Sequence, residues 1–147
     1  MNPTGKCFVS GPRGYFSFEP DFTLDRKMKL LGVFSGFYEL SEVFDAAGRA
    51  WRVEELQCRY RKSWWLTALV HTVFNPWVDV SFSWREPAEY RIKDLKTAYS
   101  NSVDQDDDIL TQFVEAAELK SKIAAAESFE DLVRVYEWMK TDHSDEK

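Results

Sequence analysis

The first 60 residues alternate between short apolar runs and turn signals. The runs "KCFVS" (6–10) and "GYFSF" (14–18) flank "GPR", in which glycine and proline mark a turn. Apolar and aromatic residues also fill 29–44, and the next segment, "VFDAAGRAWRV", places Asp45 and Gly48 at a second tight turn. This part of the chain predicts strands joined by tight turns, which is typical of an antiparallel sheet.

The strand that follows the second turn changes phase part-way along. Trp51 and Val53 share one face, whereas Leu56 and Cys58 fall on the other, because side chains alternate with a period of two along a strand. One extra residue in a strand shifts this alternation by one. We therefore predict a β-bulge near Glu54–Glu55.

The most apolar stretch, "WWLTALVHTVFNPW" (64–77), fits two structures. A helix over 63–74 would place Trp65 and Leu69 on one apolar stripe, with the polar residues on the other side. A strand would be apolar on both faces, as in the centre of a sheet, and the β-branched residues favour it. The length of the stretch favours the helix, as does the position of its polar residues on one side of that helix. Pro76 would end the helix.

The remaining chain contains one alternating segment and then helical patterns. Residues 77–84 alternate strictly between apolar and polar, which predicts a half-buried strand. Ser128 and Asp131 stand at the spacing of a capping box before an apolar helical stripe. Three segments read as helices: 90–99, 108–126 and 128–140.

These patterns predict an α+β fold with a single domain over residues 1–140. In this fold a curved, mainly antiparallel sheet packs against the central helix at 63–74 and against a C-terminal helical segment. Residues 141–147, "TDHSDEK", are polar and predict a solvated C-terminal tail. A chain of 147 residues is long enough to bury such a core without metal or disulfide bonds.

Composition points to a cytoplasmic protein that stays out of the membrane. The hydrophobic content is 44% and the charged content 30%, as in globular proteins. We find no secretory signal and no run of about 18 apolar residues that would span a bilayer. Cys7 and Cys58 are far apart and form no CxxC pair, so we expect two buried thiols.

The net charge of −6 is unevenly distributed. Residues 1–100 hold 14 Lys and Arg against 12 Asp and Glu, a net charge of +2, whereas residues 101–147 hold 5 against 13, a net charge of −8. Nucleic acid is an unfavourable partner for such a chain, because phosphate contacts need clustered cations. The one basic cluster near aromatic residues reads as a solvated strand face, with a binding face as the alternative: Arg49, Arg52, Arg59, Arg61 and Lys62.

A run of acids at 104–115 has two interpretations. Four of them occupy positions one, three, five and twelve of a calcium-binding loop: Asp104, Asp106, Asp108 and Glu115. Position six of that loop needs glycine for its sharp turn but is Ile109 here. We favour the simpler interpretation, in which Asp106, Asp107 or Asp108 caps the helix at 108–126. We therefore expect no metal site, and no motif in the chain indicates a cofactor.

Histidine offers the only hint of catalysis. His71 lies in the apolar stretch and His143 in the tail. A lone histidine cannot build a zinc site, although Cys58 and His71 would form a dyad if the fold brought them together. A structural histidine is the favoured reading, and an enzyme or small-ligand pocket near His71 is the alternative function.

Protein–protein binding without catalysis is the function that these features favour. A small, acidic, aromatic-rich α+β chain without catalytic motifs resembles, as a class, the immunity proteins that neutralise bacterial toxins. The resemblance implies an inhibitor-type role and a basic protein partner, which an acidic face would attract. The residues that we expect at the interface are Asp104, Asp106, Asp107, Asp108, Glu115, Glu118 and Trp64.

Overall fold

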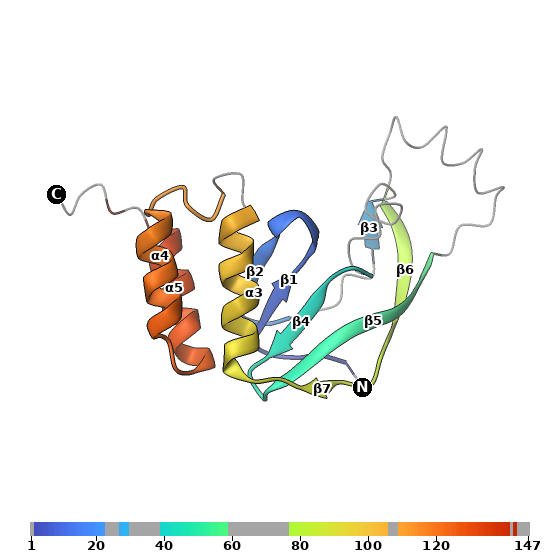
Figure 1. Ribbon diagram of the computed structural model, residues 1–147. Helices are drawn as coiled ribbons and strands as arrows, with labels where there is room; N and C mark the ends of the chain where they lie inside the picture. The colour runs from blue at the N-terminus through green and yellow to red at the C-terminus, as the bar shows by residue number, and fades with distance from the viewer. Residues whose placement is uncertain are drawn as a thin grey trace.

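A curved antiparallel sheet forms one layer of the molecule (Figure 1). The structure, a computed structural model, describes residues 2–22, 27–29, 39–58, 77–105, 109–141 and 143. The strand order is β2-β1-β4-β5-β6-β3, the short β7 pairs with β5, and every pairing is antiparallel. The strands are β1 (Cys7–Ser10), β2 (Phe16–Glu19), β3 (Lys27–Lys29), β4 (Glu42–Asp45), β5 (Arg49–Cys58), β6 (Trp77–Trp84) and β7 (Ala88–Glu89).

Helices α3 (Ile92–Gln105), α4 (Ala116–Ala125) and α5 (Phe129–Lys140) lie together on one side of the sheet (Figure 1). The predicted α+β fold with a mainly antiparallel sheet is therefore confirmed. The predicted central helix at 63–74 lies outside the described residues. Among those that are described, no helix has the length and apolar character needed to cross a membrane.

Aromatic side chains join the helices to the sheet. Phe16 of β2 stacks on Tyr99 of α3, with ring centroids 4.3 Å apart and planes 7° from parallel. Phe8 of β1 meets Phe129 and Tyr136 of α5 at 5.1 and 6.1 Å. Each such pair contributes about 0.5–1.5 kcal/mol beyond the area that it buries. The helices are thus held against β1 and β2.

The predicted turn between β4 and β5 is confirmed, and Asp45 organises it. Gly48 has φ +89°, a conformation that glycine adopts readily. The Asp45 carboxylate accepts hydrogen bonds from the backbone N–H groups of Ala47 and Arg49 at 3.0 and 2.9 Å. It also accepts from Arg49 Nε at 3.0 Å and from Trp51 Nε1 at 2.9 Å. Asp45 is only 2% exposed, so these donors replace its water.

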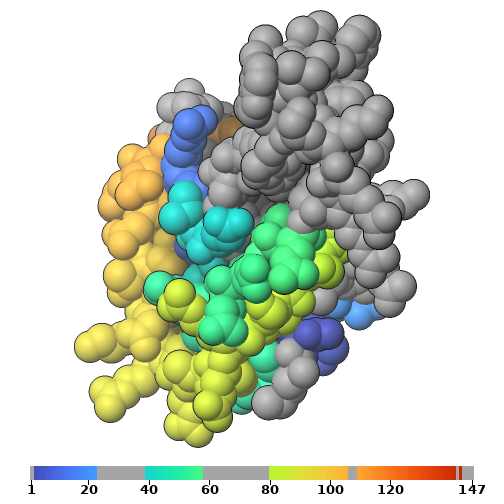
Figure 2. All heavy atoms as spheres, turned by 90° about the vertical axis from the view of Figure 1, so that its right-hand side faces the viewer, coloured from blue at the N-terminus to red at the C-terminus, as the bar shows by residue number. Residues whose placement is uncertain are grey.

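The predicted β-bulge is confirmed as well. The register between β5 and β6 shifts between Val53 and Glu55. Before the shift, Trp51 and Val53 are buried on the face of the sheet that points away from Phe8. At the surface of the molecule, β4, β5 and the segment through β7 lie side by side, next to the start of α3 (Figure 2).

The predicted helix at 108–126 is wrong in its first part. Residues 109–115 are not helical, and α4 begins only at Ala116. Leu110 is buried at 3% exposure and fixes this connection to the core, while the β-branched Ile109 and Val114 weaken helix propensity. The N-cap residue of α4 is Glu115, and the residues predicted as the cap, 106–108, lie outside the described residues.

The predicted capping box at the start of α5 is confirmed. The Ser128 hydroxyl accepts the backbone N–H of Asp131 at 3.1 Å. In return, the Asp131 carboxylate accepts the backbone N–H of Glu127 at 3.0 Å. This second bond, helped by Ser128 and Arg134, lowers the pKa of Asp131. The cap fixes where α5 begins and therefore where its C-terminal end lies.

Candidate functional site

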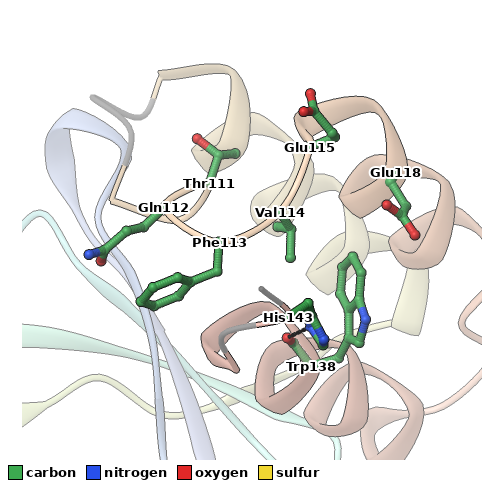
Figure 3. Close-up of a pocket in the computed structure, with 8 residues that line it drawn as sticks. All are labelled: Thr111, Gln112, Phe113, Val114, Glu115, Glu118, Trp138 and His143. Atoms are coloured by element: carbon green, nitrogen blue, oxygen red, sulfur yellow. Dashed lines mark hydrogen bonds between the residues drawn. The ribbon is translucent and has the colours of Figure 1, made fainter. Parts of the chain in front are cut away.

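A groove opens between residues 111–115, the first turn of α4 and the C-terminal end of α5 (Figure 3). Its volume is about 520 Å³, within the range of sites that hold small ligands or anchoring side chains. We call it the acidic groove. Its lining residues are Thr111, Gln112, Phe113, Val114, Glu115, Glu118, Trp138 and His143.

Trp138 and His143 form one wall of the acidic groove (Figure 3). The ring centroids of the two side chains are 5.4 Å apart, and His143 Nε2 lies 2.9 Å from the Trp138 carbonyl oxygen. His143 is thus anchored to the end of α5, although its sequence position lies in the predicted tail. On α4, Lys122 Nζ lies 4.6 Å from the centroid of the Trp138 ring.

The acidic rim of the groove comes from the start of α4. Glu115 is the N-cap residue of α4 and Glu118 lies in its first turn. Both are exposed, and neither side chain makes an ion pair or a hydrogen bond with another residue that the structure describes. Carboxylates at a helix N-terminus are favoured by the helix dipole, so the fold tolerates them there without a partner.

The loop side of the groove adds two apolar residues, Phe113 and Val114, to the polar Thr111 and Gln112. Phe113 is 39% exposed and lies at the end of the groove away from Trp138 (Figure 3). Val114 is half-buried between them. An exposed aromatic ring beside carboxylates is the kind of surface on which protein partners anchor.

Three of the predicted interface residues belong to the described part of the chain. Glu115 and Glu118 line the acidic groove, whereas Asp104 does not line it and its carboxylate is ion-paired with Lys120 of α4. Both partners of that pair are partly exposed, so the pair contributes at most about 1 kcal/mol. Four predicted interface residues lie outside the described residues: Trp64, Asp106, Asp107 and Asp108.

In the described part of the basic strand face, the arginine side chains are paired with carboxylates. Arg49 pairs with Asp45, and Arg52 pairs with Glu42 at 3.2 Å. The other three cations of the cluster, within 59–62, lie outside the described residues. The two described arginines therefore contribute to the β4–β5 pairing rather than to an unpaired positive surface.

Catalytic chemistry finds little support in the part of the chain that the structure describes. Cys7 is fully buried, and burial together with the nearby Asp45 and Glu19 carboxylates raises the pKa of its thiol to about 12. Such a thiol is a poor nucleophile. Over the same residues no group of three His, Cys, Asp or Glu side chains is placed to hold a metal ion. His71 and the Cys58 side chain, the predicted dyad, lie outside this part.

No protein-family model, no curated protein and no solved structure matches the chain. Its function must therefore be inferred from the chemistry of the site itself.

Of the eight described residues that line the groove, six escaped prediction, and three of these carry its rings: Phe113, Trp138 and His143. Phe113 was assigned to a helix that starts too early, and His143 to a tail without any pattern. Trp138 did carry a signal, because it falls outside the buried stripe of α5 that contains Leu132 and Met139. Trp138 is half-buried and packs at the edge of the core, so part of its ring remains for another surface.

Proposed function

We propose that this chain is a protein-interaction module, of the inhibitor or immunity type, that binds a basic protein partner through the acidic groove. The observation that carries the proposal is the lining of the groove. It combines the carboxylates of Glu115 and Glu118 with the aromatic rings of Phe113 and Trp138, and among the lining residues that the structure describes there is no Lys or Arg.

Each component has a distinct part in such binding. The two carboxylates would attract a basic surface and speed its approach, an effect that weakens as salt rises. The aromatic rings would supply the buried anchor contacts, which carry most of the free energy at protein interfaces. The volume of the groove, about 520 Å³, is enough for one or a few side chains.

The experiment is a pull-down of the tagged protein from its native lysate, with mass spectrometry of the retained proteins. The test variant is Glu115→Lys with Glu118→Lys. The matched control is Glu86→Lys with Glu89→Lys, which makes the same change of charge at exposed sites near β7, away from the groove. Melting temperatures of all three proteins verify that each one is folded.

We expect a basic protein that the wild type and the control retain, that the groove variant loses, and that high salt releases. If the groove variant retains the same proteins as the wild type, the acidic groove is not the binding site. If no basic protein is retained in a lysate of cells that express this chain, the proposed partner class is wrong.

A further inference from the structure

The indole of Trp138 already carries a cation. The Lys122 ammonium lies 4.6 Å from its ring centroid, within the range of about 6 Å in which a cation is attracted to the face of an aromatic ring. Lys122 is exposed and is not one of the residues that line the acidic groove. The Trp138 indole thus contacts the Lys122 ammonium and also lines the acidic groove.

The two neighbouring lysines of α4 differ in what they contact. Lys120 pairs with a carboxylate, that of Asp104, whereas Lys122 rests on the indole. Glu118 precedes Lys122 by one helical turn, and its side chain lies on the same side of the groove as the indole (Figure 3). An aromatic face and a carboxylate therefore meet at one end of the groove, and the Lys122 ammonium contacts the same indole.

We propose that Trp138 and Glu118 bind an arginine side chain of the basic partner, in competition with Lys122. This inference rests on the proposed function, since it names the group of the partner that enters the groove. A guanidinium is planar and weakly hydrated, so it stacks on an indole and pairs with a carboxylate at the same time. An ammonium is compact and strongly hydrated, which makes Lys122 the weaker occupant.

Charge complementarity selects this occupant over others. The groove holds two carboxylates and an electron-rich ring face, both of which favour a cation and disfavour an acidic or neutral segment. Phe113 and Val114, at the loop side, would contact the apolar stem of the arginine or a neighbouring apolar residue. A second cation on the same indole is repelled by Lys122, so removal of the lysine charge is expected to favour binding.

The test uses the full chain and a fluorescein-labelled hexa-arginine peptide, with hexa-lysine as the comparison probe. Lys122→Met removes the competing cation, and Lys120→Met is the matched control, because it makes the same change of charge on the same helix. We expect the arginine peptide to bind the wild type more tightly than the lysine peptide. We further expect Lys122→Met to tighten arginine binding by about 3-fold or more, and Lys120→Met to do so by less than about 2-fold.

A second readout is specific to the site. The indole N–H resonance of Trp138, assigned by its loss in Trp138→Phe, should shift when the arginine peptide is added. An unmoved Trp138 resonance, or equal gains from the two lysine variants, would overturn this inference and leave the groove as a general acidic surface. If the wild type does not bind the arginine peptide, the inference is also wrong. The pull-down with the Glu115 and Glu118 variant decides the proposed function separately.

Discussion

The carboxylate of Asp45 and the carboxylates of Glu115 and Glu118 have opposite surroundings. Asp45 is 2% exposed and accepts four hydrogen bonds from its own turn. Glu115 and Glu118 are exposed, and within the described part of the chain neither side chain has a polar partner. The same chemical group therefore stabilises the fold in one place and is left available for another molecule in the other.

The largest effect is expected at the buried carboxylate. Asp45→Ala would remove the acceptor of the buried Trp51 indole N–H, of two part-buried backbone N–H groups and of Arg49 Nε, so we expect a loss of about 3–5 kcal/mol in the free energy of unfolding. Denaturant titration measures it. The control is Glu42→Ala, which removes an exposed ion pair with Arg52 and should cost about 1 kcal/mol or less. If Asp45→Ala and Glu42→Ala lower the free energy of unfolding by a similar small amount, the buried carboxylate stabilises the fold no more than the exposed one does.

An intermediate effect is expected from the tyrosine attached to the same turn. The Tyr90 hydroxyl donates to the Asp45 carbonyl at 2.7 Å, and burial together with the Asp45 charge raises the pKa of Tyr90 well above its ordinary value of 10.0. Because the folded-state pKa is the higher one, this contribution to stability is complete below about pH 10. It is lost as the pH rises from there, where only the unfolded chain releases the proton.

The free energy of unfolding, measured on either side of pH 10.0, checks this expectation. Tyr90→Phe should reduce the alkaline loss of stability and should cost about 1 kcal/mol at neutral pH through its hydrogen bond. Tyr99, whose pKa burial also raises, remains in this variant and keeps part of the alkaline slope. An alkaline slope that is identical in the variant would show that Tyr90 ionises as freely in the folded protein as in the unfolded one.

The smallest effect on stability is expected at the groove. Glu115→Gln with Glu118→Gln removes two exposed charges that favour the start of α4, so we expect a loss of less than about 1 kcal/mol. Association with the retained basic partner should nevertheless slow, and its dependence on salt should flatten. Stopped-flow association rates at low and high salt measure both. Unchanged rates would place these carboxylates in the same structural role as Asp45.

Local patterns were sufficient to predict most of the described strands and the boundaries that depend on nearby residues. The phase change after Val53 predicted the bulge, because side chains alternate with a period of two and one extra residue keeps the apolar side chains of both halves of β5 on one face. Ser128 and Asp131 predicted the start of α5, because a capping box acts within a single turn. In each case the deciding interaction spans only a few residues.

The groove could not be predicted in the same way, because distant segments build it. Glu118 was expected at an interface from its charge, but its neighbour Trp138 comes from the next helix, and only the packing of α4 on α5 brings them together. The late start of α4 has a similar cause. Leu110 is buried in the core, and this long-range contact prevailed over the local helical pattern of the surrounding residues.

The bulge in β5 also determines where the chain tolerates a change in its length. The bulge already contains one extra residue, so deletion of one residue at 54–55 would give a regular strand and would leave Val53 and Leu56 on one face, opposite Trp84 and Phe82. Deletion of one residue elsewhere in β5 would instead move the side chains beyond it to the other face of the sheet. The connection at 111–115 pairs with no strand, so one residue added there displaces only the loop. Related sequences should therefore differ in length beside the acidic groove or at the bulge, and keep a constant length in the regular parts of β5 and in β6.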